Sequence, residues 1–223
     1  MKLTLFDLDG TLLPTDSDHA FGDFVIGLGW ADAADHKRRN DQFYADYQAG
    51  RLDMTAYVDF ASAPWRDRSP RDLDEAMQRF VREVMQPQLH PAALALVRQH
   101  QTAGDLIAIV TATNDFVTRP IARLFGVDVL IATDLARDDQ GRATGAIQGT
   151  PAFREGKIER VLAWLAGRGQ TLASFERSTF YSDSINDLPL LDHVSHPVAT
   201  NPGASLLRVA QERHWPVLNL FHP

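Results

Sequence analysis

Short, largely apolar runs, each long enough for one strand, constrain the fold most. The clearest runs are 2–6, 106–110, 127–132 and 178–182, and weaker candidates are 194–199 and 216–220. Near-continuous apolar runs are typical of strands that are buried on both faces. We therefore expect a parallel sheet that is covered by helices.

Helical patterns separate these runs. They lie near 91–103, 115–125, 155–168 and 203–213. Strands that alternate with helices predict an α/β fold, here a Rossmann-like, doubly wound parallel sheet. In addition, the alternating segments around Asp138-Asp139-Gln140-Gly141 predict a β-hairpin within 132–150.

The segment 14–87 has no strand pattern. Helices are expected near 17–28, 31–49, 53–62 and 70–85. We therefore divide the chain into a core domain, residues 1–13 and 88–223, and a helical-bundle cap, residues 14–87, inserted after the first strand. The aromatic side chains of this segment recur at helical spacing and predict a helical core: Phe21, Phe24, Phe43, Tyr44, Tyr47, Tyr57 and Phe60.

Composition excludes several classes of function. The chain has 223 residues and a net charge of -7, which argues against a nucleic-acid partner. It contains no cysteine, so thiol catalysis and thiolate metal sites are excluded, and its scattered histidines argue against zinc. No signal segment and no run of ~18 apolar residues are present. These features predict a cytoplasmic protein, a monomer or homodimer, with no membrane partner.

The first candidate motif, Asp7-Leu8-Asp9-Gly10-Thr11, directly follows the run 2–6. Ligands of open α/β sheets bind beyond the carboxyl ends of the strands. Paired carboxylates at such a place can hold Mg²⁺, attack phosphorus or shuttle a proton. Gly10 lets the backbone approach an anion, and Thr11 can donate to a phosphate oxygen. The alternative is an acidic turn, but four fixed positions directly after the first strand are rarely matched by chance.

Two further candidate residues are weaker when each is considered alone. Thr111 directly follows the run 106–110, and a hydroxyl there can hydrogen-bond a phosphoryl oxygen. Lys157 lies near the start of a helical pattern, where a lysine is ordinarily solvated. Each gains weight only as part of a set.

Acidic and amide residues also follow the run 178–182. Asp183 can face a metal ion, with Asp187 supporting it from one helical turn away and Asn186 between them. An N-capped helix with acidic residues in its first turn is the alternative. That alternative does not account for the whole cluster.

In this order and at these strand ends, the four motifs resemble the haloacid dehalogenase superfamily over the whole chain. The resemblance implies a nucleophile at Asp7 and a general acid/base at Asp9. It implies Mg²⁺ at Asp7, Asp9 and Asp183, with Asp9 contributing its backbone carbonyl. Thr111 and Lys157 match the phosphate-stabilising hydroxyl and lysine. Asp187 and Asn186 match supporting positions.

The inserted helical segment resembles the subfamily with a small four-helix cap, which includes phosphoserine phosphatases. The string 181–191, with His196-Pro197 after it, resembles a branch that includes phosphoserine and histidinol-phosphate phosphatases. Asp16 aligns with a cap glutamate that meets the ammonium group of phosphoserine, although it could simply N-cap the first cap helix. We expect the substrate to contact Gly10, Thr11, Asp16, Ala112 and Thr113.

Departures from phosphoserine phosphatases at Gly10, 111–113 and 182–184 leave the substrate open. The sequence predicts an Mg²⁺-dependent phosphomonoester hydrolase that forms an aspartyl-phosphate, with an amine-bearing substrate such as phosphoserine or histidinol phosphate. The acid at Asp9 separates this chain from dehalogenases, because a phosphatase must protonate the leaving alkoxide. A phosphomutase or phosphotransferase, and a catalytically silent binding protein, are the alternatives.

Overall fold

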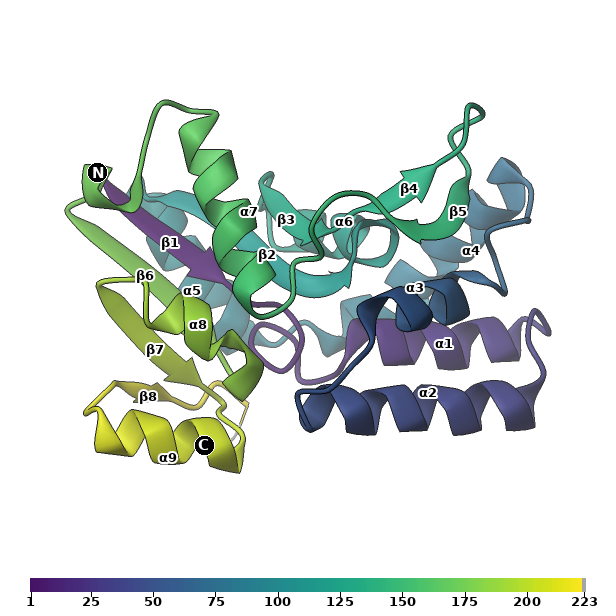
Figure 1. The fold of residues 1–223 in the computed structure, drawn as a ribbon, viewed down its shortest axis with the longest axis horizontal. Coiled ribbons are helices and arrows are strands. Elements are labelled where there is room, and N and C mark those ends of the chain that lie inside the picture. The colour runs from purple at the N-terminus through teal and green to yellow at the C-terminus, as the bar shows by residue number, and fades with distance from the viewer. Residues whose placement is uncertain (222–223) are drawn as a thin grey trace.

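The computed structural model describes residues 1–221. Its centre is a six-stranded sheet with the order β3-β2-β1-β6-β7-β8, and all five strand pairs are parallel. The strands are β1 (Lys2–Phe6), β2 (Leu106–Asn114), β3 (Leu130–Thr133), β6 (Arg177–Ser182), β7 (His196–Thr200) and β8 (Val217–Leu218). The predicted parallel α/β sheet is confirmed. Because β1 lies between β2 and β6, residues that follow these three strands meet at one edge (Figure 1).

Helices cover both faces of this sheet. They are α5 (Pro91–Thr102), α6 (Asp115–Leu124), α7 (Glu155–Ala166), α8 (Leu188–Leu191) and α9 (Ala204–Glu212), with short turns η3 (Leu172–Ser174) and η4 (Ile185–Asp187). Neighbouring residues of β1 are buried in two different apolar clusters, one on each face of the sheet. Leu5 packs with residues of α7 and α9, and Phe6 packs with residues of α5 and α6. This alternation is what a doubly wound sheet requires.

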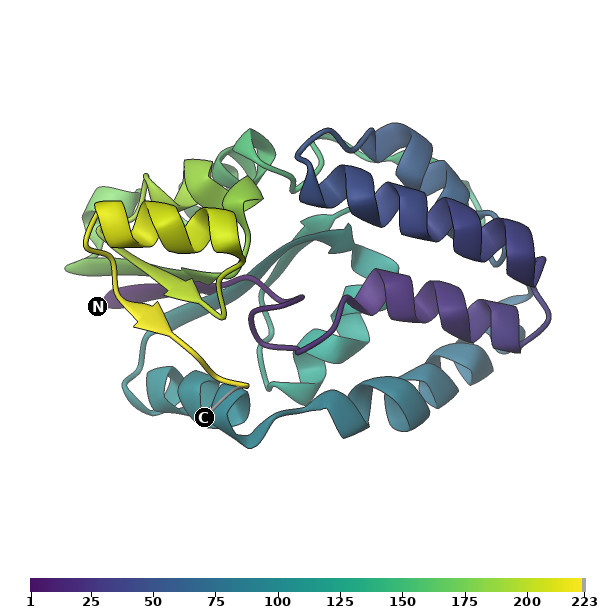
Figure 2. The same ribbon diagram turned by 90° about the horizontal axis from the view of Figure 1, so that it is seen from below.

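Four helices follow β1 before the chain reaches α5 and then β2. They are α1 (Ser17–Gly27), α2 (Ala33–Gln48), α3 (Met54–Ser62) and α4 (Pro70–Phe80), followed by a π-helical turn η1 (Val81–Met85) and a 3₁₀ turn η2 (Gln86–Gln88). Each of the four begins at a capping side chain, namely Asp16, Asp32, Asp53 and Ser69. Figure 2 shows α1 and α2 side by side at the end of the molecule away from β7, β8 and α9.

The four-helix segment and the sheet share one apolar cluster. Phe21 of α1 and Phe80 of α4 lie 4.9 Å apart between ring centroids, and the ring of Trp65 stacks on that of Phe116 in α6 at 4.2 Å. Burial of such rings favours a docked position of the helices. The predicted hairpin is also present, as β4 (Leu135–Arg137) and β5 (Ala143–Ile147), and β5 packs against α3.

Strand boundaries differ from the sequence expectation at three places. β2 runs on through Thr111 to Asn114, and its register with β3 shifts between Val110 and Asn114. β-branched residues favour extended backbone, which explains the continuation. β3 begins at Leu130 rather than at residue 127, and β8 is only two residues long.

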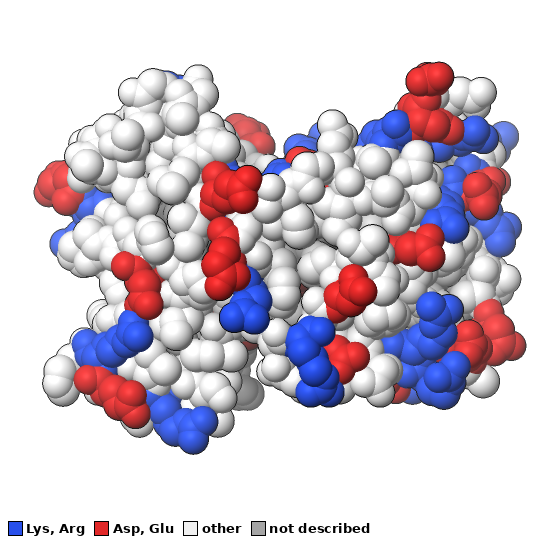
Figure 3. Space-filling model, viewed as in Figure 1, with Lys and Arg blue, Asp and Glu red and all other residues white. Residues whose placement is uncertain are grey.

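The surface in Figure 3 carries lysine and arginine side chains interspersed with aspartate and glutamate, without a broad patch of one sign. No helix within residues 1–221 has both the length and the apolar character that crossing a bilayer demands.

Candidate active site

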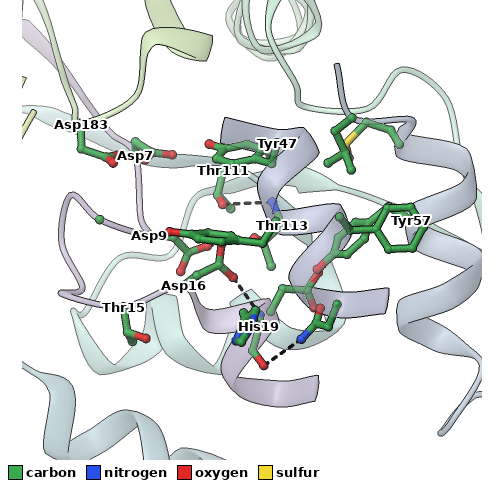
Figure 4. Close-up of a pocket in the computed structure, with 18 of the residues that line it drawn as sticks. Asp7, Asp9, Thr15, Asp16, His19, Tyr47, Tyr57, Thr111, Thr113 and Asp183 are labelled. Carbon is green, nitrogen blue, oxygen red and sulfur yellow. Dashed lines mark hydrogen bonds between the residues drawn. The ribbon is translucent and has the colours of Figure 1, made fainter. Parts of the chain in front are cut away.

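A cavity of about 140 Å³ lies where the carboxyl ends of β1 and β2 face helices α1, α2 and α3. Figure 4 shows side chains from the sheet and from these helices pointing into it. Its wall consists of Asp7, Asp9, Gly10, Pro14, Thr15, Asp16, Asp18, His19, Asn40, Phe43, Tyr44, Tyr47, Leu52, Met54, Tyr57, Thr111, Ala112, Thr113 and Asp183. The sheet edge where the sequence predicted a site is therefore open to a small ligand.

Asp7 is fixed from three sides. Its backbone N–H donates to the carbonyl oxygen of Tyr181 at 2.9 Å, which anchors the end of β1 to β6. Lys157 Nζ donates to Asp7 Oδ1 at 2.8 Å, and Thr11 Oγ1 donates to Asp7 Oδ2 at 3.2 Å. The residue is only 4% exposed. A carboxylate held in one orientation beside a cation is well prepared for attack on an anionic group.

Thr11 is placed differently from the expectation. It is fully buried and does not line the cavity; its hydroxyl lies between the carboxylates of Asp7 and Asp183, 3.0 Å from Asp183 Oδ1. It therefore positions two acids rather than presenting itself to a ligand. The backbone at this turn is held by Asn201, whose Nδ2 donates to the carbonyl oxygens of Gly10 and Thr11 at 3.0 and 3.1 Å. Sequence reasoning missed Asn201, for which the only signal was the turn-forming Asn-Pro-Gly that follows β7.

Gly10 is required at its position for two reasons. Its φ is +75°, a conformation that side chains disfavour. A Cβ atom there would also lie 2.4 Å from Asp183 Oδ2. The glycine thus lets the first motif approach Asp183 closely.

Lys157 is almost completely buried and bridges two acids. Its Nζ donates to Asp7 Oδ1 and, at 2.7 Å, to Asp187 Oδ2, which also accepts from Ser182 Oγ at 2.7 Å. Burial alone would lower the pKa of Lys157, but the charges of Asp187 and Asp7 outweigh burial and raise it. The lysine therefore stays charged beside Asp7.

Asp9 lines the same cavity as Asp7. Its Oδ1 accepts from the backbone N–H of Ser17 at 2.8 Å, and its Oδ2 accepts from Thr113 Oγ1 at 2.9 Å. Burial raises the pKa of Asp9 well above its ordinary value, and the nearby charges of Asp16 and Asp7 add to this. A raised pKa favours the protonated carboxyl group, which can act as a proton donor.

Of the predicted ligand contacts near the end of β2, Thr111, Ala112 and Thr113 all line the cavity. The hydroxyl of Thr111 accepts from the backbone N–H of Thr113 at 3.2 Å, so its own proton is available for a ligand oxygen. Thr113 is committed to Asp9 instead.

The charges around Asp7 and Asp183 fit a divalent cation. Within residues 1–221, Asp183 has no basic side chain at ion-pairing distance, whereas Lys157 serves both Asp7 and Asp187. Burial, followed by the charges of Asp7 and Asp187, raises the pKa of Asp183 well above its ordinary value. No three His, Cys, Asp or Glu side chains converge as a closed metal cage within these residues. Mg²⁺ does not need such a cage, since it is commonly held by one or two carboxylates and retains several waters.

Asn186 contacts the helical segment rather than Asp183. Its Nδ2 donates to the backbone carbonyl of Tyr47 in α2 at 2.8 Å. Nearby, the side chain of Arg154, whose φ is +52°, donates to the carbonyl of Gly50 at 3.1 Å. These bonds join the end of α2 to η4 and to the residue that precedes α7.

A second polar group lies at the start of α1. Asp16 N-caps this helix, accepting from the His19 backbone N–H at 2.8 Å, and also lines the cavity, so both sequence interpretations of Asp16 agree with its geometry. Asp18 is 7% exposed, and its Oδ1 accepts from Asn114 Nδ2 at 3.0 Å. Sequence reasoning missed Asp18, Asn114 and Tyr57, because the contacts join distant parts of the chain.

The aromatic residues of the helical segment divide into two groups, which corrects the expectation that all form a core. Phe21 and Phe60 are buried as predicted, and Phe24 packs against the apolar cluster that contains Phe21. By contrast, four rings line the cavity: Phe43, Tyr44, Tyr47 and Tyr57. The sequence period cannot distinguish a core face from a face that covers a ligand cavity, since both are apolar.

Comparison with known proteins agrees with this geometry. The family model of haloacid dehalogenase-like hydrolases matches residues 4–192. A histidinol-phosphatase of Neisseria meningitidis is 47% identical over 218 residues, which cover 98% of each protein. A phosphoserine phosphatase of Mycobacterium tuberculosis is 29% identical over 95% of this chain and 68% of that protein.

Solved structures give the same fold. A Bordetella pertussis protein of unknown function superposes with a TM-score of 0.93 at 50% identity, covering 99% of both chains. A substrate-bound phosphoserine phosphatase superposes with a TM-score of 0.68 at 16% identity over 97% of this chain and 92% of the other. At that identity, the second likeness concerns the fold alone.

Proposed function

The chain belongs to the haloacid dehalogenase-like hydrolases and is a phosphatase of that family, and from this premise we propose that it hydrolyses a small, amine-bearing phosphomonoester through an aspartyl-phosphate on Asp7. The observation that carries the proposal is that two acids line one cavity in different surroundings. Asp7 accepts a hydrogen bond from the charged Lys157, whereas burial and nearby negative charges raise the pKa of Asp9. Two acids whose surroundings differ in this way are suited to the separate roles of nucleophile and general acid.

In the first step, an oxygen of Asp7 attacks phosphorus and the ester P–O bond breaks. The leaving oxygen takes the proton of Asp9, so the alcohol departs neutral. Lys157 and the Thr111 hydroxyl stabilise the negative charge that spreads over the phosphoryl oxygens.

In the second step, Asp9, now ionised, takes a proton from water while the water oxygen attacks the phosphorus of the aspartyl-phosphate. The bond between phosphorus and the Asp7 oxygen breaks, which releases inorganic phosphate and restores both acids. The Thr113 hydroxyl and the Ser17 N–H hold the Asp9 carboxylate in position for both proton transfers.

Asp7 and Asp183, with the backbone carbonyl of Asp9, are the residues that would hold Mg²⁺. When bound, the cation neutralises phosphoryl charge and fixes the in-line orientation. The excess of buried carboxylates over Lys157 supports this assignment.

Histidinol phosphate is the substrate that we propose first. It carries an amine and an imidazole but no carboxylate. The described residues that line the cavity include Asp16 and Asp18 and no lysine or arginine. The similarity to a histidinol-phosphatase supports the same choice. Phosphoserine is the second candidate, because it shares the amine next to the phosphoryl-bearing carbon.

We assign residues 14–87 to a cap domain and residues 1–13 and 88–223 to the core domain. The cap would close over the substrate and exclude bulk water. We further propose a cytoplasmic monomer or homodimer with no nucleic-acid partner, consistent with the mixed charges of the surface in Figure 3 and the net charge of -7.

A phosphate-release assay tests the proposal. Histidinol phosphate, phosphoserine, glycerol phosphate and a hexose phosphate are each supplied with Mg²⁺. We expect the largest kcat/KM for histidinol phosphate, and equal or better turnover of the hexose phosphate would refute the proposal of an amine-bearing substrate. Adding free sugars as acceptors separates hydrolysis from phosphotransfer, because transfer would form new phosphate esters at the expense of inorganic phosphate.

A further inference from the structure

The cavity has a distal end that the chemistry of Asp7 and Asp9 does not use. At this end Asp18 is buried, and Asn114 Nδ2 donates to its Oδ1 at 3.0 Å. The orientation of Asn114 is fixed, because its Oδ1 accepts from the backbone N–H of Val117 at 3.1 Å as the cap of α6. Tyr57 of α3 lines the same cavity, and its hydroxyl acts to lower the pKa of Asp18, which favours the ionised carboxylate.

The acids of the cavity follow one another from the reacting end outward. The Ser17 N–H bond to Asp9 fixes the start of α1 over the reacting end. Figure 4 shows Asp16 next to Asp9, with Tyr57 on the side of the cavity away from Asp7. Asp18 follows Asp16 by two residues, at the start of α1, and lines the same cavity.

No basic side chain neutralises this row of carboxylates. Among the described residues of the cavity wall, His19 is the only basic one, and its ring lies against Asp41 outside the wall at 3.1 Å. A buried carboxylate without a cationic partner is costly unless a ligand supplies the missing positive charge or proton. Such a row favours a ligand with basic groups at two distances from its phosphoryl group.

We propose that Asp18, positioned by Asn114 and Tyr57, is a specificity-determining residue that binds a second, distal basic nitrogen of the substrate, such as an imidazole, while Asp16 meets the amine nearer the phosphoryl group. This inference rests on the proposed function and deepens it. According to this inference, Asp18 determines the selectivity of the enzyme for a substrate with a basic distal group over one with an acidic distal group.

The protonation behaviour of Asp18 is consistent with this role. Burial, followed by the charge of Asp16, raises the pKa of Asp18 to about 7, whereas Tyr57, Asn114 and His19 act in the opposite direction. An imidazole titrates near 6.5 in water. A carboxyl group and an imidazole of similar pKa can share one proton in a hydrogen bond across the neutral range, because either can be the donor.

The same residue disfavours phosphoserine. The distal group of phosphoserine is a carboxylate, which Asp18 would repel at short range or which would have to be buried with an extra proton. A site discriminates strongly when the wrong ligand leaves its own buried charged group unpaired. Asp18 therefore acts by rejecting an acid as well as by binding a base.

Asp18→Asn is a conservative test. The new side-chain oxygen can keep the bond from Asn114 Nδ2, so the amide NH₂ replaces the carboxylate oxygen that faces the cavity. Asp32→Asn is the control, because it makes the same substitution at an acid near the start of a neighbouring helix. Asp32 caps α2, accepting from Asp35 N at 2.8 Å, and lies outside the cavity wall.

The readout is the ratio of kcat/KM for histidinol phosphate to that for phenylalaninol phosphate, which keeps the amine and replaces the imidazole with a phenyl ring. We expect the wild type and Asp32→Asn to favour histidinol phosphate by about 10- to 100-fold, the usual range for a hydrogen bond to a charged group. In Asp18→Asn the ratio should fall close to one. The preference for histidinol phosphate over phosphoserine should shrink in the same variant.

Each outcome separates the two proposals. A wild type that hydrolyses glycerol phosphate but not histidinol phosphate would overturn the proposed substrate. A wild type with the expected preference, together with an Asp18→Asn variant that keeps it, would overturn the role of Asp18 and leave the proposed function standing. If Asp18→Asn does not fold, the wild-type ratio of kcat/KM still tests the proposal. A ratio near one would show that no group of the protein binds the distal nitrogen, which would overturn the proposal.

Discussion

Lys157 Nζ lies 2.8 Å from Asp7 Oδ1, although 150 residues of chain separate the two. Both side chains are at least nine-tenths buried, with exposed fractions of 1% and 5%. This pair, rather than either residue alone, supports a charged nucleophile at the reacting end of the cavity.

Lys157→Met should therefore impair both activity and stability. Loss of one charge-stabilising donor lowers kcat by about 10²–10³ in comparable sites. Asp7 and Asp187 would be left buried without their partner, which costs about 3–5 kcal/mol. Steady-state kinetics and urea unfolding measure the two effects. Lys37→Met is the control, because its ion pair with Asp41 is exposed to solvent and contributes little to stability.

Chelation should abolish activity, and Mg²⁺ should restore it. Because the pKa of Asp183 is raised in the metal-free protein, binding should release a proton, so the affinity for Mg²⁺ should increase with pH. Calorimetric titration in buffers of different ionisation enthalpy measures this release. Asp183→Asn should weaken binding strongly. Full turnover in the presence of excess EDTA would contradict the assignment of Asp7, Asp9 and Asp183.

The stability of the ligand-free protein should depend on pH through Asp18. Its pKa is about 7 in the folded state and near 3.8 in the unfolded state, so the folded state binds the extra proton between these values. The stabilisation is complete below about pH 4 and disappears as the pH rises through 7. From pH 5 to pH 8, Asp18→Asn should gain about 2–4 kcal/mol relative to the wild type.

Urea unfolding at the two pH values provides this measurement. Asp9, Asp16 and Asp183 titrate in both proteins, so the difference between them reports the proton of Asp18 together with its coupling to Asp16. A constant difference across the range would show that Asp18 keeps an ordinary pKa.

The contact between Asn186 and Tyr47 should restrain the cap. Asn186→Ala removes the 2.8 Å bond to the Tyr47 carbonyl. We expect faster hydrogen exchange at the end of α2, near residues 45–50, and a several-fold change in KM, because a looser cap closes less often over the substrate. Unchanged exchange there would show that the other cap contacts suffice.

The sequence predicted the sheet, the hairpin and the four helices within residues 14–87, because each depends on local hydrophobic period and on the turn residues that separate the segments. It also predicted Asp7 and Asp9, because both follow one strand within a few residues. It did not predict how far β2 extends, since Thr111 and Thr113 suit a strand and a loop equally well.

The distal end of the cavity lay beyond sequence reasoning for a different reason. Asp18 and Asn114 are 96 residues apart, and neither belongs to a motif with fixed spacing. The same holds for Asn201 and Gly10, and for Asn186 and Tyr47. Such pairs form only when the cap and the sheet come together, so local pattern carries no signal for them.

The most direct test of the whole account is to trap the covalent intermediate. The enzyme is mixed with histidinol phosphate and Mg²⁺, quenched during turnover and reduced with borohydride, which converts an aspartyl-phosphate to homoserine. Peptide mass spectrometry then locates the change. The account predicts homoserine at position 7, and no such product from Asp7→Asn, which should also lack turnover. Phosphate release without modification of Asp7, or near-wild-type turnover by Asp7→Asn, would contradict it.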